Sequence, residues 1–164
     1  HSGAHQVFVA ARKGVRADLA RQFGAEVLDP TEIDVVAEIK KRTNGVGVDL
    51  AIETAAQPET VTMAMQATRT LGRVVEVGIF EKPATFELND LVFQESELIG
   101  ISNNSGEFPQ AIQMMGDGRV DPGPMISSRI SLENVVEKGF EECILNKRSN
   151  VKVIVNCNED LREL

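Results

Sequence analysis

The chain has 164 residues, of which 42% are hydrophobic, and it carries a formal net charge of −8. This acidic balance argues against nucleic acid as the main partner, because binding phosphate groups requires a basic face. The sequence shows no apolar run that could cross a bilayer and no signal peptide, and Cys143 and Cys157 make neither a disulfide framework nor a zinc knuckle. We therefore expect a cytoplasmic protein without a membrane partner, built as one globular domain or one domain and part of another.

The N-terminal stretch has the pattern of a strand, a turn and a helix. Because the sequence begins at His1 and not at a methionine, we expect it to be the C-terminal part of a longer protein. Residues 7–10 form a continuous apolar run, which is typical of a strand buried on both faces, and residues 11–14 form the turn after it. A helix is predicted over residues 15–23, with Gly24 as its C-cap.

The next segment predicts a short strand at residues 27–28 and a second helix. Thr31 is the expected N-cap of that helix, and residues 44–47 end it. Its inward-facing residues are expected to be Ile33, Val36, Ala37 and Ile39.

A strand, a crossover helix and a second strand follow over residues 48–80. The first strand covers residues 48–53, Pro58 occupies the first helical position, Gly72 ends the helix, and residues 73–79 form the next strand. The helical stripe comprises Val61, Ala64, Met65 and Leu71. This βαβ pattern predicts an α/β fold with a parallel sheet and helices on its faces.

The remaining elements are a strand, a helix, a strand, a helix and a strand. Residues 97–101, beginning with Glu97, form the first strand, and Ser105 caps a helix. Residues 126–130 are extended, Ser131 caps the last helix, and residues 151–155 form the last strand. The apolar stripe of the last helix is Leu132, Val135, Val136, Phe140, Cys143 and Ile144, so Cys143 is expected to be a core residue.

Ligands in open parallel sheets bind beyond the carboxyl ends of the strands. In this chain those ends are residues 53–56 and 77–79. Gly78 either leaves room for a flat ligand against the backbone or only turns the chain. The residues themselves provide no catalytic constellation and no cluster with metal-ligand spacing, so no catalytic residue and no metal ligand is predicted.

Four segments, residues 7–30, 45–80, 97–122 and 125–155, together resemble the medium-chain dehydrogenase/reductase family, in the order and spacing of its zinc-type alcohol, sorbitol, butanediol and threonine dehydrogenases. The resemblance implies an incomplete doubly wound parallel sheet, because the family's first strand, its G-x-G-x-x-G turn and its zinc-binding catalytic domain would precede this sequence. It also implies that residues 1–103 belong to the nucleotide-binding domain and residues 104–164 to the catalytic domain.

The resemblance assigns cofactor roles to three places. Near the adenosine, where NAD-specific members have an acidic residue, this chain has Ala11 followed by cations, which suits the 2′-phosphate of NADP(H) and leaves NAD as the alternative. Residues 53–56 lie toward the adenine, residues 77–79 toward the nicotinamide, and residues 101–103 toward its carboxamide. The implied cofactor-binding residues are Ala11, Arg12, Lys13, Arg16, Thr54, Ala55, Val77, Gly78, Ile79, Ile101, Ser102 and Asn103.

The implied activity is hydride transfer between a nicotinamide cofactor and an alcohol or polyol, or its ketone, with zinc present only in the intact parent protein. A zinc-free, quinone-reductase-type relative is the near alternative, and a non-catalytic nucleotide-binding or self-association module is the alternative from another class. By the resemblance, residues 97–101 are the edge strand through which the chain would form homo-oligomers. The chain alone is expected to be inactive and to bind the cofactor weakly. We also expect the place of the missing strand, beside residues 7–10 and 48–53, to be filled by another strand or removed by rearranged pairing.

Overall fold

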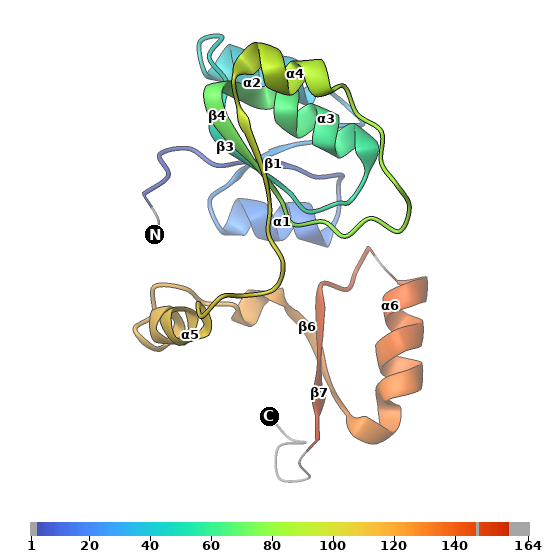
Figure 1. Ribbon diagram of the computed structural model, residues 1–164. Coiled ribbons are helices and arrows are strands. Elements are labelled where there is room, and N and C mark those ends of the chain that lie inside the picture. Colours follow the sequence, from blue (N-terminus) through green and yellow to red (C-terminus); the bar gives the residue numbers. More distant parts are fainter. Residues whose placement is uncertain (1–2, 147, 158–164) are drawn as a thin grey trace. The chain divides into compact units, whose positions relative to one another are not determined.

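A computed structural model describes residues 3–146 and 148–157 of the chain (Figure 1). By its internal contacts the chain divides into two units. The first unit comprises His1–Asp29 together with Gly106–Leu164, and the second comprises Pro30–Ser105. Each unit contains parallel strands connected through helices, so the predicted α/β class with parallel sheets is confirmed.

The second unit is a three-stranded parallel sheet in the order β3-β4-β5. Its strands are β3 (Val48–Glu53), β4 (Thr68–Glu76) and β5 (Glu97–Gly100), so the predicted bounds of β3 are confirmed. The connecting helices are α3 (Pro58–Ala67) and α4 (Leu88–Gln94), and α2 (Val35–Arg42) precedes the sheet. Pro58 occupies the first turn of α3, as its preset φ and missing N–H predict.

The core of the second unit lies between α3 and the sheet. It is formed by Val61, Met65 and Val74, all at most 2% exposed. Around this core pack the partly buried side chains of Ala51, Ala64, Phe80, Phe86, Leu91 and Leu98. The opposite face of β3 carries Leu50 and Ile52, which are 49% and 59% exposed, so the alternation over residues 48–53 gives an apolar face that the described residues leave largely open.

The expected position of Leu71 on the α3 stripe is wrong. The helix ends at Ala67, since the next residue, Thr68, is already extended; the hydroxyl and the amide of Thr68 both donate to the carbonyl of Ala64. Leu71 then lies in β4 at φ +58° and is 66% exposed. Gly72 is inside the strand and not at the end of the helix, and the second strand ends at Glu76 and not at residue 79.

The predicted cap of α2 is wrong, whereas among the expected inward-facing residues Ile39 is buried as predicted. Asp34, and not Thr31, caps the helix, because its carboxylate accepts a hydrogen bond from the Ala37 amide at 3.0 Å. The later start shifts the buried face to Val35 and Ile39 and leaves Ile33 exposed.

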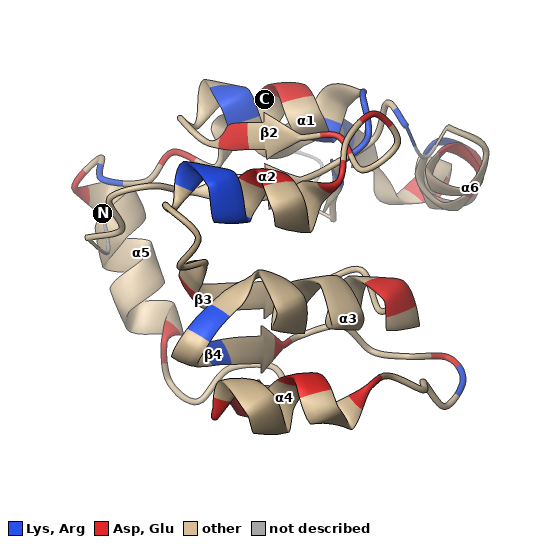
Figure 2. Ribbon diagram, turned by 90° about the horizontal axis from the view of Figure 1, so that it is seen from above, with Lys and Arg blue, Asp and Glu red and all other residues tan. Residues whose placement is uncertain are grey.

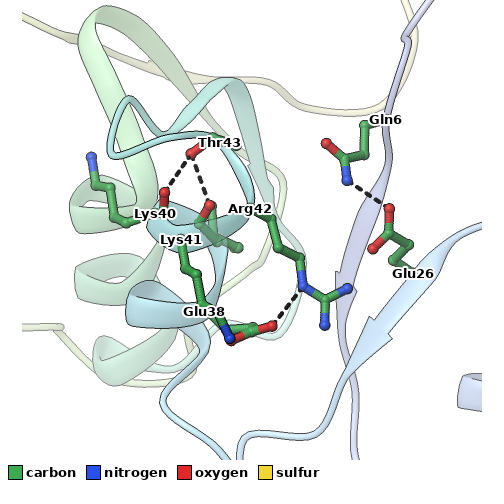
Figure 3. Close-up of polar contacts among 8 residues, drawn as sticks. Gln6, Glu26, Glu38, Lys40, Lys41, Arg42 and Thr43 are labelled. Atoms are coloured by element: carbon green, nitrogen blue, oxygen red, sulfur yellow. Dashed lines mark hydrogen bonds and ion pairs between the residues drawn. The ribbon is translucent and has the colours of Figure 1, made fainter.

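Polar contacts tie down the C-terminal end of α2. The Thr43 hydroxyl donates to the carbonyl of Ile39 at 2.8 Å, and Arg42 pairs with Glu38 at 2.8 Å (Figure 3). The last turn is cationic, with Lys40, Lys41 and Arg42, as the blue patch on α2 in Figure 2 shows. This charge complements the negative end of the helix dipole.

The first unit contains two parallel strand pairs. In the N-terminal part, β1 (Phe8–Ala10) pairs with β2 (Glu26–Leu28), and α1 (Val15–Gln22) connects them. The side-chain amide of Gln6 donates to Glu26 at 2.6 Å across this pair (Figure 3).

In the C-terminal part of the first unit, α5 (Phe108–Gly116) precedes β6 (Ile126–Ser131), which pairs with β7 (Lys152–Asn156). The 3₁₀ helix Gly123–Met125 leads into β6. The connection from β6 to β7 contains the 3₁₀ helix Leu132–Asn134, the π-helix Val135–Glu141 and α6 (Glu142–Leu145).

The expected caps and apolar stripes of this C-terminal part are only partly correct. The helix over 108–116 forms, but Glu107, and not Ser105, occupies its N-cap position, and Ser131 makes no capping bond to the backbone. The stripe of the last helix is on the surface in the described structure, and Cys143, expected in the core, is exposed. The exposed members are Leu132, Val136, Phe140 and Ile144, at 53–65%.

Within the described residues, β1 pairs only with β2, and β3 pairs only with β4. Each therefore has one edge without a strand partner, and what occupies those edges stays a prediction. No helix in the described part of the chain has the length and hydropathy needed to cross a membrane.

Met65 tests how much the core of the second unit contributes to stability. We expect Met65→Ala to lower the free energy of unfolding by about 2–4 kcal/mol, because it leaves a cavity at a fully buried site. Met115→Ala on α5 is the matched control, since Met115 is 43% exposed and its loss should change stability by less than about 0.5 kcal/mol. Urea denaturation of both variants measures the difference, and equal losses would contradict this core.

Candidate functional site

The carboxyl ends of β3 and β4 meet at one edge of the second unit. Glu53 and Glu76 are the last residues of the two strands, and they lie opposite each other in the parallel register. The ladder continues one residue further on each side, because the Val77 amide donates to the Glu53 carbonyl at 2.9 Å and the Ile101 amide donates to the Glu76 carbonyl at 3.0 Å. The ends of all three strands are thus joined at this edge.

Glu53 is a buried carboxylate, 3% exposed, that holds the turn between β3 and α3. Its Oε1 accepts hydrogen bonds from the amides of Ala55 at 2.8 Å and Ala56 at 3.1 Å, and from the Thr60 hydroxyl at 2.5 Å. Burial raises the pKa of Glu53, but the hydrogen bonds from Thr60, Glu76, Ala56 and Ala55 outweigh it and bring the pKa below its ordinary value. Glu53 is therefore the ionised member of the glutamate pair.

Glu76 accepts fewer hydrogen bonds than Glu53, and its pKa is raised and not lowered. Its Oε1 accepts a hydrogen bond from the Gly78 amide at 2.9 Å, while its Oε2 is buried without a donor among the described residues. Desolvation, the side-chain hydrogen bond with Glu53 and the repulsion of that neighbouring charge raise the pKa of Glu76 to about 7. The side-chain hydrogen bond between the two carboxyl groups requires a proton, and the raised pKa of Glu76 places that proton on Glu76.

Gly78 lies directly against this pair. A Cβ at this position would be 2.6 Å from Glu53 Oε2, 2.8 Å from the Ala56 nitrogen and 2.9 Å from Glu76 Oε1. The space that a side chain would need is therefore already used by the two carboxyl groups and the turn. Neither sequence interpretation of Gly78 included this reason for a glycine.

The implied nicotinamide-side residues gather around the same edge. Val77, Ile79 and Ile101 are apolar and 39%, 87% and 52% exposed, so they offer an open apolar surface that fits a flat ring. Thr54 and Ala55 lie in the turn that Glu53 holds, and Ser102 and Asn103 follow Ile101; all four are exposed. The structure brings these residues of the second unit together.

A pocket opens beside Glu76 in the second unit. Its volume is about 430 Å³, and its apolar lining includes Val61, Phe80, Phe86 and Leu98. Sequence reasoning missed both this pocket and the role of Glu76. The available signal was a glutamate inside the apolar run of residues 74–79, where a charged side chain needs a partner.

The four implied adenosine-side residues, Ala11, Arg12, Lys13 and Arg16, lie in the first unit at the turn after β1. The Ala11 amide donates to the Leu28 carbonyl at 3.0 Å, and the Lys13 amide donates to a carboxylate oxygen of Asp29 at 2.9 Å. The side chains of Arg12 and Lys13 are exposed, and Arg16 donates to the Asn150 carbonyl at 3.1 Å. This turn therefore presents two cations and, through Asp29, one carboxylate.

The described residues do not fit a zinc site. Over residues 3–146 and 148–157, no three histidine, cysteine, aspartate or glutamate side chains are grouped closely enough to hold a metal ion. No zinc-dependent step is therefore assigned to these residues.

Comparison with known proteins gives one consistent result. Residues 1–117 match the family model described as zinc-binding dehydrogenase. The chain is 35% identical over 155 residues to the (R,R)-butanediol dehydrogenase of Neisseria gonorrhoeae, covering 93% of this chain and 44% of that protein.

Solved structures agree with this match. The 2R,3R-butanediol dehydrogenase of Bacillus subtilis superposes with a TM-score of 0.88 at 34% identity, covering 96% of this chain and 45% of that chain. A putative zinc-binding dehydrogenase from Sinorhizobium meliloti, solved bound to NADP, superposes with a TM-score of 0.82 at 29% identity, covering 95% of this chain and 46% of that one. The chain thus spans less than half the length of these relatives.

Gly78→Ala tests the close packing of the glutamate pair. We expect a loss of about 1–3 kcal/mol in the free energy of unfolding, because the added methyl group overlaps both carboxyl groups and the Ala56 amide. Gly100→Ala is the control in the neighbouring strand, where a Cβ meets nothing within 4 Å and stability should change by less than about 0.5 kcal/mol. Chemical denaturation compares the two; an unchanged G78A protein would contradict the packing.

Glu76→Gln tests the raised pKa through the pH dependence of stability. Because Glu76 binds its proton more tightly in the folded state, the protein loses stability as the pH rises from the ordinary pKa of 4.5 to the folded-state pKa of about 7. Measured above about pH 5, where Glu53 is ionised in both states, the variant should gain on the order of 1–2 kcal/mol over the wild type by about pH 8. If the difference in the free energy of unfolding between the variant and the wild type were the same at every pH, the raised pKa would be contradicted.

Proposed function

The chain belongs to the zinc-binding dehydrogenase family, and we propose that it is part of an NADP(H)-dependent oxidoreductase that transfers hydride between nicotinamide and an alcohol or polyol, or its ketone. The observation that supports this most directly is the family match over residues 1–117. Because the chain spans 44–45% of the butanediol dehydrogenases, the activity is assigned to a protein that contains this chain and further residues. By itself the chain would be inactive.

In this proposal the chain's own residues bind and orient the cofactor. Nicotinamide, when bound, supplies the carbon that accepts or returns the hydride. Val77, Ile79 and Ile101 would cover the ring with apolar surface, which excludes water from the reacting carbon. The Gly78 backbone would also line the nicotinamide, Ser102 and Asn103 would lie near its carboxamide, and Thr54 and Ala55 would lie toward the adenine.

The choice of NADP(H) depends on the turn after β1. Arg12 and Lys13 are exposed cations, and Ala11 provides no carboxylate for a ribose 2′-hydroxyl, so the turn suits a 2′-phosphate. The Sinorhizobium meliloti structure bound to NADP supports this choice. The Asp29 carboxylate on the Lys13 amide favours NAD, which is the alternative cofactor.

The zinc and the substrate pocket are assigned to other parts of the protein. The described residues hold no group of metal ligands, so the zinc that the family description names would be bound by residues outside them. A zinc-free, quinone-reductase-type enzyme is the alternative within the superfamily. We place residues 1–103 in the nucleotide-binding domain, residues 104–164 in the catalytic domain, and the protein in the cytoplasm.

The second candidate function is a non-catalytic module that binds nucleotide or associates with itself. The observation in favour of self-association is that β5 pairs only with β4 among the described residues, so its other edge has no strand partner there. In either function we propose that residues 97–101 join two copies edge to edge.

The test is an oxidation assay of the full-length gene product with both cofactors. We expect oxidation of vicinal diols, with 2,3-butanediol first, and a preference for NADP over NAD. Arg12→Ala should reduce that preference by about 10- to 100-fold, because it removes a charge-assisted contact to the 2′-phosphate. No turnover with any secondary alcohol would favour the module.

Arg21→Ala is the matched control for Arg12→Ala. Arg21 lies on α1, is exposed, and pairs with Asp18 at 2.8 Å, so its loss removes one positive charge without removing a proposed phosphate contact. The cofactor preference of this variant should equal that of the wild type. If both variants lose the preference equally, general electrostatics and not Arg12 selects the cofactor.

A further inference from the structure

We propose that Glu53 and Glu76 share one proton and that this proton positions two backbone segments, the turn at Ala55 and Ala56 and the strand end at Gly78. Glu53 and Glu76 are thus positioning residues, not catalytic residues. Only the identity of the ligand that these segments meet rests on the proposed function; the shared proton follows from the geometry of the second unit.

Glu53 Oε2 and Glu76 Oε1 both lie beside Gly78, where a Cβ would be 2.6 Å from the first oxygen and 2.9 Å from the second. Glu53 Oε1 already accepts from Ala55, Ala56 and Thr60, and Glu53 Oε2 accepts from the Ala56 amide at 3.1 Å. Glu76 Oε1 accepts from the Gly78 amide. Glu76 Oε2 is buried and has no hydrogen-bond partner among the described residues. The hydrogen bond between the two side chains needs one proton, which belongs to Glu76 because the pKa of Glu76 is the raised one.

The shared proton joins elements that are far apart in sequence. Glu53 holds the turn before α3 and the hydroxyl of Thr60 in the first turns of that helix, while Glu76 holds the Gly78 amide. A side chain at position 78 would not fit beside the two carboxyl groups, so Gly78 packs directly against them. When the proton leaves, two carboxylates face each other at partly desolvated positions, and their repulsion pushes the Gly78 segment away from the turn.

Other charged groups around the pair are few and partly exposed. Glu81 and Lys82, in the loop after β4, line the same pocket as Glu76 and carry opposite charges. Helix α3 contributes the Thr60 hydroxyl and carries the exposed Glu59 beside it. Strand β5 places Gly100 opposite Glu76. The proton on Glu76 is therefore held first by desolvation of the carboxyl group and then by Glu53, which is the neighbouring charge that raises the pKa of Glu76 to about 7.

The experiment is a pH titration of the 164-residue chain followed by NMR, with the carboxyl carbons of Glu53 and Glu76 and the amides of Ala55, Ala56 and Gly78 as reporters. We expect the Glu76 carbon and all three amides to shift with one common midpoint near pH 7. In Glu53→Gln the Glu76 midpoint should fall by about one pH unit or more, because the neighbouring charge is gone. A Glu76 midpoint near 4.5, or amides that do not follow it, would overturn the proposal.

Three further variants separate a shared proton from general packing. Glu76→Gln can still donate to Glu53, so it should keep the low-pH amide positions and lose the titration near pH 7. Glu76→Ala removes the donor to Glu53, the acceptor of the Gly78 amide and the second carboxylate, so its amide positions should differ from those of the low-pH form and should not titrate near pH 7. Glu59→Gln removes an exposed charge from the same turn of α3 and should leave the midpoint unchanged.

The titration needs no cofactor, so it is independent of the proposed function. If the full-length protein binds no dinucleotide while the midpoints coincide, the proposed function fails and the shared proton stands. If the full-length protein binds NADPH but the three amide signals do not titrate with Glu76, the shared proton does not position these segments.

Discussion

The buried carboxylate of Glu53 is the main constraint on the second unit. An unpaired carboxylate at this depth would cost several kcal/mol, so the fold must supply donors for it. The chain does so with two amides of the following turn, the Thr60 hydroxyl and the proton on Glu76. These donors fix where the turn after β3 lies, where α3 begins and how close β4 comes.

The same constraint explains two backbone features at this edge. Ala56 has φ +54°, a left-handed conformation that costs an alanine about 1 kcal/mol, and its amide thereby reaches both oxygens of Glu53. Gly78 must have no side chain, because the two carboxyl groups occupy the space. The backbone at this edge is therefore shaped by the glutamate pair before any ligand is considered.

The parts of the fold that follow from local sequence could be predicted, and the parts that depend on distant partners could not. The strand over residues 48–53 and the helix start at Pro58 follow from residue patterns and from proline's fixed φ. The extension of α3 to Leu71 was wrong because the chain is already extended at Thr68, which pairs with Val48 as the first residue of β4. Periodicity selects apolar faces but not what covers them, so the stripe that includes Phe140 was expected in the core and is exposed among the described residues.

The candidate site shows the same division. The place of residues 77–79 after the carboxyl end of a parallel strand could be predicted from the βαβ pattern, whereas residues 101–103 were implied only by the family resemblance, and ligand binding at both stays a prediction. The pairing of Glu53 with Glu76 could not, because it depends on the register of two strands separated by a helix, and a shift of one residue would turn one carboxyl group to the opposite face. The sequence shows two glutamates at the ends of apolar strands, but only the register of the folded sheet shows that they lie opposite each other.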